Sequence, residues 1–562
     1  MRALVLPVFL LFVASCGSCG EHDAAQAPPP PAAEAPIAAP PGVLAEIALA
    51  APDANWKRAQ AMVGGVAALA PATFGGVMAM ALGADASLGE QIDGAATARA
   101  MVVGDAASAR LVWAVHLKSG AKARKALVDG DAAKWSASGE VASIDVVVGA
   151  GTPGKGEWVL GLTHGEFLVA AKSRGDLEAF GPYAYRTLPT LAPPAQAASV
   201  TVSHAALAGP VAAWLEAQVA TSKASLLSMD EALRTSHGGR SPDFGEPRVI
   251  VGALGQWASS LVAVTGDLDH VAASLDLAPG GVALDVRMTP APVAGPSRAY
   301  FASLRPGDAS ALLDAADGAV VTAMLRSDAT ARSQNAADLA DTIIQMSDGR
   351  LAPGDAKSLT AGLGAFAKER GDFVVAAVGA AAPRGLLVTT RVASDVAGCR
   401  ALGQVVDACT RPPLYGLIEG ALDAQSLKSA SVDFDGVGKG RLVTVKRSAS
   451  PRSLLGPEIG LGFAAKDGLL AVAIGPDPAA LMKSAAHAEH TFGADAKVAE
   501  AVHALAADAS FAAVIVPGAL SAAPRSDAVV VGAGRRGDEA FFSASASAGA
   551  VRQLASMLIR GL

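Results

Sequence analysis

The same succession of sequence elements occurs twice in this chain. Each copy has two short apolar runs joined by a turn of small residues, followed by a residue of the kind that begins a helix. Three pairs of segments repeat in the same order, with an offset that grows from about 275 to about 310 residues. The pairs are Ala98–Leu127 with Asp372–Leu402, Gly156–Phe180 with Gly456–Met482, and Ala198–Trp214 with Ala509–Pro524. Either the chain contains a duplicated domain with insertions, or an Ala- and Val-rich composition produces a chance match.

The repeated unit predicts strands and helices in a fixed order. Short apolar runs rich in Val and Leu are typical of strands, and neighbouring runs joined by a few turn residues are typical of antiparallel hairpins. A Ser, Asp or Gly after the second run indicates the start of a helix that packs back on the sheet. The sequence therefore predicts an α+β fold: two related domains of mostly antiparallel sheet with packed helices.

The length of 562 residues is enough for two to four domains. We place the first domain at 43–245 and the second, with extra strands, at 246–562. The boundary falls in the segment TSHGGRSPDFGEPR (235–248), whose Gly, Pro and charged residues indicate an exposed loop. The extra strands include Val271–Leu277 and Val282–Met288, which a four-residue turn joins.

The N-terminus begins with Arg2 and an apolar run, Leu4–Ala14, too short to span a bilayer as a helix. The run ends in Val13-Ala14-Ser15-Cys16, an aliphatic residue and two small ones before a cysteine. This pattern resembles the lipobox of bacterial lipoproteins. The resemblance implies that 1–15 are a signal peptide and that Cys16 becomes the acylated first residue of the mature chain, with palmitate among the expected lipids. An ordinary secretory signal and a redox C-x-x-C formed by Cys16 and Cys19 are the alternatives.

Residues 16–42 are rich in Ala and Pro and predict a disordered tether. Pro-rich segments are extended and semi-rigid. Gly17 follows the lipid-bearing cysteine, which in such lipoproteins favours outer-membrane sorting over inner-membrane retention. We therefore expect a protein of the cell envelope, anchored to the membrane by its N-terminal lipid and facing the periplasm or the cell surface.

Two further apolar segments need an explanation. Ala59–Ala84 has 26 residues without a charge, long enough to span a bilayer. Because glycines and Pro71 interrupt it, we interpret it as two short core helices that meet near Pro71 and pack closely at their glycines. Ala550–Leu562 has leucines at helical spacing, which predicts a terminal helix docked on the body or, alternatively, lying on a membrane surface.

The motifs that suggest chemistry have simpler interpretations. Gly532–Gly537 fits G-x-G-x-x-G, but Phe541 and Phe542 follow in a strand-like run, so we predict a hairpin turn. His487 and His490 lie one helical turn apart without an evident third metal ligand. With a net charge of −7 and no dense basic tract, no nucleic-acid partner is predicted. We identify no catalytic residue, no metal ligand and no cofactor-binding residue, and no cofactor is predicted.

Cys399 and Cys409 form a possible disulfide. If Asp395–Cys409 is one helix, ten residues separate the two Cα atoms by about 15 Å, whereas a disulfide needs about 7 Å or less. A bond would therefore require a break in the helix, for which Gly403 is the candidate. Free buried cysteines and a local disulfide both remain open.

Together these features predict a lipid-anchored envelope protein with a binding or structural role and no identifiable catalysis. An unknown envelope protein, a lipid or an envelope polymer is the expected partner. The alternatives are an envelope hydrolase with an unrecognised site and a surface adhesion or assembly module.

Overall fold

The structure is a computed structural model of the chain. It describes residues 35–561 except for 66–68, 130–134, 150–157, 164–165, 237–246, 316–318, 348–350, 379–384, 413, 417–423, 448–456, 487–490, 506–507 and 521–526. The predicted domain boundary at 245/246, the signal peptide and most of the tether lie outside the described residues. The chain packs into two compact units: unit 1 comprises 1–214, 266–292 and 546–562, and unit 2 comprises 215–265 and 293–545.

The described residues of unit 1 form a ten-stranded antiparallel sheet with the order β10-β9-β8-β1-β2-β3-β7-β6-β5-β4. The strands are β1 (Val43–Leu49), β2 (Ala98–Val103), β3 (Arg110–His116), β4 (Trp135–Val141), β5 (Ile144–Gly149), β6 (Val159–Thr163), β7 (Phe167–Ala171), β8 (Ala198–Ser203), β9 (Leu268–Ala278) and β10 (Gly281–Pro290).

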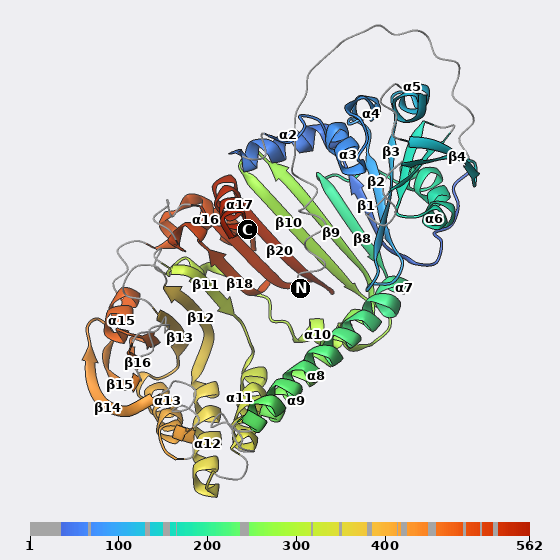
Figure 1. The fold of residues 1–562 in the computed structure, drawn as a ribbon. Coiled ribbons are helices and arrows are strands. Elements are labelled where there is room, and N and C mark those ends of the chain that lie inside the picture. The colour runs from blue at the N-terminus through green and yellow to red at the C-terminus, as the bar shows by residue number, and fades with distance from the viewer. Residues whose placement is uncertain are drawn as a thin grey trace. The chain divides into compact units, whose positions relative to one another are not determined.

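In unit 2 the described strands follow the order β20-β19-β18-β11-β12-β13-β17-β16-β15-β14, again antiparallel (Figure 1). They are β11 (Ala319–Leu325), β12 (Arg370–Val378), β13 (Gly385–Val392), β14 (Ala424–Phe434), β15 (Gly438–Arg447), β16 (Glu458–Lys466), β17 (Leu469–Gly475), β18 (Ala509–Ile515), β19 (Val529–Arg536) and β20 (Glu539–Ser547).

The two strand orders are identical when the strands of each unit are counted along the chain. Strand β1 corresponds to β11, β2 to β12, and so on through β10 and β20. The three repeated pairs of segments in the sequence fall on corresponding strands. The prediction of an α+β fold with related, mostly antiparallel sheets and packed helices is confirmed.

The helices of unit 1 cover both faces of its β2–β7 region. On one face, α3 (Phe74–Leu82), α4 (Ala86–Gln91) and α5 (Gly120–Arg124) bury Trp113, Leu160 and Leu168. On the other, α6 (Arg174–Arg186) buries Ile144 and Val146.

The helices of unit 2 follow the same plan. The described ones that pack on its sheet or on one another include α11 (Ala329–Met346), α12 (Pro353–Glu369), α13 (Asp395–Cys409), α15 (Pro478–Ala486) and α16 (Ala496–Leu505). On one face, α15 and α16 bury Met324, Val514 and Val530 in the main core. On the other, α13 packs at β16, where Phe463 is 2% exposed.

Serine side chains begin corresponding helices, as the repeated sequence predicts. The Ser119 side chain accepts a hydrogen bond from the Lys122 N–H at the start of α5, and Ser394 accepts one from the Ala397 N–H at the start of α13. Each serine pairs one of the N–H groups that the first turn of a helix leaves without a backbone partner.

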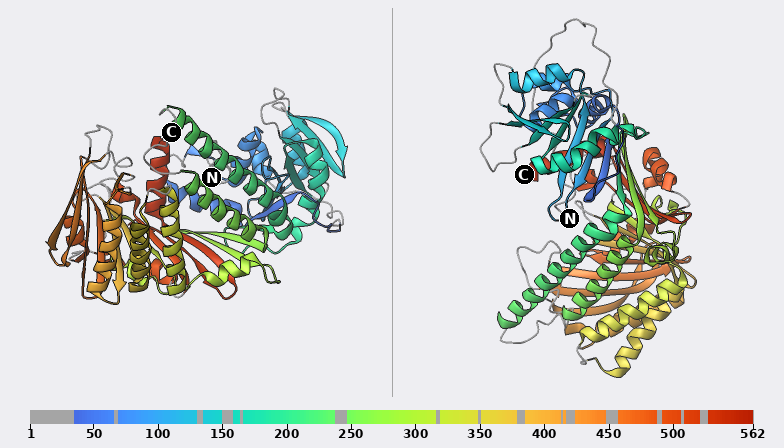
Figure 2. Two further views of the ribbon diagram at one scale, coloured as in Figure 1. Left: turned by 90° about the horizontal axis from the view of Figure 1, so that it is seen from below. Right: turned by 90° about the vertical axis from the view of Figure 1, so that its right-hand side faces the viewer.

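A long insertion in the first repeat distinguishes it from the second. The connection between β8 and β9 contains two long helices, α8 (Ala212–Ser236) and α9 (Pro247–Gly266), which run side by side in Figures 1 and 2. The corresponding connection between β18 and β19 contains a short 3-10 turn, Pro517–Leu520. On α9 the Trp257 side chain is 63% exposed. Among the described residues, no helix is both long and apolar enough to cross a bilayer.

Three further local predictions agree with the structure, except that the close glycine contact of α3 is made with α4, outside the predicted segment. The uncharged segment Ala59–Ala84 contains the end of α2 (Pro52–Val63) and all of α3, on either side of Pro71. Gly532–Gly537 ends strand β19 and turns into β20. The chain ends in α17 (Ala548–Gly561), which packs against α2 and β10 in unit 1.

The last part of the predicted tether contacts unit 1. The Ile37 N–H donates to Oγ1 of Thr187 at 2.8 Å, and the Thr187 hydroxyl donates to the Ile37 carbonyl oxygen at 2.8 Å. Attachment to the folded body therefore begins before the first strand.

The contact between α3 and α4 depends on two glycines. A Cβ atom on Gly75 would lie 2.2 Å from the carbonyl oxygen of Gly89, so the helices touch backbone to backbone. We expect Gly75→Ala to force them apart and to lower the free energy of unfolding by about 1–3 kcal/mol. Gly364→Ala on α12 is the control, because nothing lies within 4 Å of its added Cβ. That variant should be neutral or slightly stabilising. Thermal or urea unfolding gives the stability of both variants. Equal stability of the two would contradict the contact.

Candidate functional site

An apolar surface covers one face of the central strands of unit 2. The register Val321↔Ala377, Ala323↔Val375 and Leu325↔Phe373 places these β11 and β12 side chains on one face, because paired residues share a face. Pairing with β13, β18 and β19 extends it. We call the set the apolar face of unit 2: Val321, Ala323, Leu325, Phe373, Val375, Ala377, Leu386, Val388, Phe511, Ala513, Ile515, Val529, Val531 and Ala533.

This face is apolar yet incompletely covered. Ala513 is buried, Leu325 is 57% exposed, and the other members are half-buried. The alternate residues of the same strands, such as Met324 and Val514, are at most 1% exposed in the core on the opposite face. An antiparallel sheet with one solvated face usually alternates apolar and polar residues. Here both faces of the strands are apolar, which is the pattern of strands covered on both sides.

Unit 1 has a smaller counterpart on β8, β9 and β10. The register places Val271, Leu275 and Val286 on one face and polar residues such as Ser274 and Asp285 on the other. The apolar side chains are all half-buried: Ala198, Val200, Val202, Val271, Ala273, Leu275, Leu277, Val282, Leu284, Val286 and Met288. In both units, large apolar surfaces open to water mark binding sites for ligands, partners or membranes.

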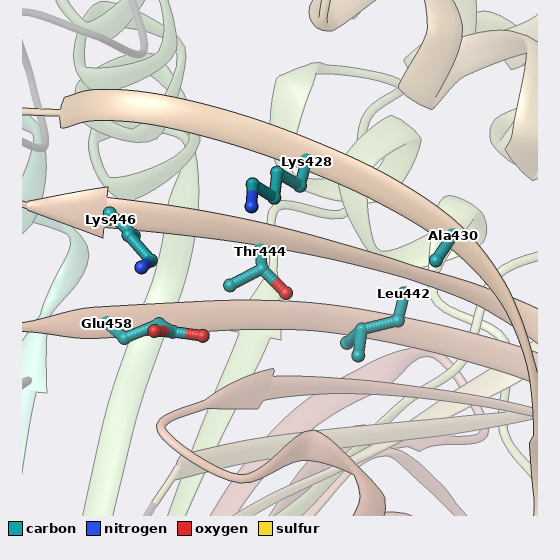
Figure 3. Close-up of a pocket in the computed structure, with 6 residues that line it drawn as sticks. All are labelled: Lys428, Ala430, Leu442, Thr444, Lys446 and Glu458. Carbon is teal, nitrogen blue, oxygen red and sulfur yellow. The ribbon is translucent and has the colours of Figure 1, made fainter.

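A hollow of about 330 Å³ lies at the other end of the unit 2 sheet (Figure 3). The side chains that line it come from β14, β15 and β16: Lys428, Ala430, Leu442, Thr444, Lys446 and Glu458. Lys446 and Glu458 stand opposite each other on neighbouring strands, which places opposite charges side by side. The lining combines two apolar and four polar or charged side chains and includes neither a serine or cysteine nucleophile nor a histidine.

The most strongly perturbed titratable group in unit 1 is part of a structural contact. The Tyr183 hydroxyl on α6 donates to Oε1 of Glu46 on β1 at 2.7 Å. Burial and this hydrogen bond to a carboxylate raise the pKa of Tyr183, so the phenol stays protonated. The pair joins α6 to the sheet, and no described cavity opens on it.

The residues singled out from the sequence do not form one site. Cys16, Cys19, His487 and His490 lie outside the described residues. In the described parts of the chain, no group of three or more His, Cys, Asp and Glu side chains could hold a metal ion.

Cys399 and Cys409 lie on one continuous helix, α13, and both are free thiols in the structure. Cys399 packs against the main core of unit 2, and Cys409 packs in the cluster formed by α11, α12 and α13. Burial raises the pKa of both thiols. The two side chains therefore occupy separate apolar environments.

These raised pKa values predict slow alkylation. Since the thiolate is the nucleophile, iodoacetamide should modify both cysteines of the folded protein more slowly at pH 8 than in urea. The rate should keep rising above pH 9, where an ordinary thiol is already largely ionised. Peptide mass spectrometry gives the rates. A 399–409 peptide lighter by two hydrogens and unreactive without reductant would instead show a disulfide.

Comparisons of the chain with protein-family models, with curated proteins and with solved structures give no match. Its function therefore has to be inferred from its own residues.

Sequence reasoning did not identify the apolar face. The signal was present in AVVTAML (Ala319–Leu325) and in Phe373–Val378, which are apolar at consecutive positions instead of at alternate ones. Such runs predict a strand covered on both sides, but they do not show which side the chain's own helices cover.

Proposed function

We propose that this chain is a cell-envelope lipoprotein, anchored by lipid at Cys16, that binds an apolar ligand of the lipid class on its exposed sheet faces. The observation that carries the ligand part is the apolar face of unit 2. Leu325, at 57% exposed, and its half-buried neighbours lose contact with water when an apolar molecule covers them. Each Å² of apolar surface removed from water contributes roughly 25 cal/mol.

The proposed location rests on the resemblance of residues 13–16 to the lipobox. A lipid anchor with more than one acyl chain gives stable membrane attachment. It would keep the two units beside a source of lipid in the outer membrane or, if sorting fails, the inner membrane. Binding to an envelope protein or polymer is the alternative use of the same faces.

Anchoring at Cys16 predicts a clear difference between the two N-terminal cysteines. In cells given radiolabelled palmitate, the natural chain and Cys19→Ala should carry label and fractionate with membranes. Cys16→Ala should lose both the label and the membrane association, because it has no acyl acceptor at that position. Persistence of the label in Cys16→Ala would remove the anchor from the proposal.

Ligand binding at the apolar face predicts a loss that is separate from stability. Leu325→Ser removes an exposed apolar side chain, so the free energy of unfolding should change by no more than about 0.5 kcal/mol. This variant should bind the co-purifying lipid roughly five-fold more weakly and therefore carry less of it. Solvent extraction and mass spectrometry measure the lipid content.

Val396→Ser on α13 is the matched control. Its side chain is 66% exposed but lies outside the apolar face. Equal lipid content in both variants, or no lipid in the natural protein, would count against binding at the apolar face.

A further inference from the structure

One end of the apolar face of unit 2 carries a positive charge. The Arg370 guanidinium lies over the Phe373 ring, 3.9 Å from its centroid, and Phe373 is a member of the apolar face. Phe366 of α12 packs beside the same ring, with a centroid separation of 6.3 Å. The aromatic pair thus holds a cation at the margin of an otherwise apolar surface.

A second guanidinium lies next to the first. Arg332 of α11 donates from Nε to the carbonyl oxygen of Ala367, near the end of α12, at 3.3 Å. It also donates to the carbonyl oxygen of Ser327. Arg370 donates from Nη1 to the carbonyl oxygen of Gly371 at 3.0 Å. These acceptors are all neutral.

Carboxylates do not balance the two charges. Among the described residues, neither Arg332 nor Arg370 forms a salt bridge. The carboxylate that acts on Arg370 belongs to Asp372, and it is already paired with Arg326 at 3.3 Å. It also accepts the N–H of Ser327 at 3.2 Å.

The surroundings of Arg370 lower its pKa. Burial, followed by the neighbouring charge of Arg332, lowers the pKa of Arg370 to about 10. The group is still charged at neutral pH, but its charged form is less stable than usual. The carbonyl end of α12 supplies the equivalent of about half a negative charge, which is less than two guanidinium groups need. An anion at this position would stabilise both.

We propose that the apolar face of unit 2 binds a long-chain fatty acid, whose hydrocarbon chain lies over Leu325, Phe373 and Val375 and whose carboxylate pairs with Arg370 and Arg332. This inference rests on the proposed binding of lipid and names its chemical class. A carboxylate fits because a guanidinium can donate two parallel N–H bonds to its two oxygens. A neutral lipid would cover the same apolar side chains but would leave both charges without a counter-ion.

The test compares two probes with the same hydrocarbon chain. Oleate and oleyl alcohol are titrated against the full chain after its bound lipid has been removed, and the dissociation constants are measured by calorimetry. We expect oleate to bind at least ten-fold more tightly, since hydrogen bonds to charged groups contribute about 1.5–3 kcal/mol. Arg370→Gln and Arg332→Gln should each weaken oleate binding several-fold and leave the binding of oleyl alcohol within two-fold.

Two further variants keep the outcomes distinct. Arg391→Gln is the control, because Arg391 is an exposed arginine on the adjacent strand β13 whose side chain alternates away from the apolar face. It should bind oleate as the natural chain does, and Arg370→Lys should keep part of the preference. Equal binding of both probes, with no effect of the arginine variants, would overturn the fatty-acid inference and leave lipid binding in place. If neither probe binds, both the fatty-acid inference and the proposed lipid binding would be overturned.

Discussion

The central strands of unit 2 are apolar on both faces, so each of these faces has to be covered. In unit 2, α15 and α16 cover one face so fully that Met324 and Val514 are at most 1% exposed. On the opposite face, α13 packs over Phe463. The ion pair between Asp407 and Arg441, at 2.6 Å, joins this helix to β15. Towards β11 and β18 the described helices leave that face half open. Covering apolar side chains is the dominant favourable term in folding, so an apolar molecule bound there would complete a core.

The duplication explains why both units share this incomplete cover. Their ten strands have the same order, and the helices inserted after the first and third strands pack towards the same end of each sheet. At the far end of that face, on β8–β10 in unit 1 and on β18–β19 with β11 in unit 2, most apolar side chains are only half-buried in both copies. The insertion of α8 and α9 in the first copy shows that the connections can change while the strand order stays the same.

The sequence predicts local structure here better than it predicts surfaces. Pro71 and its neighbouring glycines separate two helices. The run with Phe541 and Phe542 after Gly537 indicates a strand instead of a nucleotide-binding turn. Both conclusions need only neighbouring residues. The apolar face joins Leu325 to Phe373 and Phe511, which are far apart in the chain. Only strand register brings them together, and a shift of one residue would move each set to the other face. Arg332 and Arg370 likewise meet only because α11 and α12 pack on each other.

The two copies differ in charge at the position where Arg370 and Arg332 would pair with a carboxylate. The last pair of the β11–β12 register joins Leu325 to Phe373, and the corresponding pair of the β1–β2 register joins Leu49 to Ala98. Ala98 is 6% exposed and packs in the core beneath α3 and α4, so unit 1 has neither the aromatic ring nor the guanidinium at this position. Among the described residues, the physical basis for selecting an anionic head group therefore lies in unit 2. The apolar side chains described on the face of unit 1 give no basis in charge for distinguishing a fatty acid from a neutral lipid.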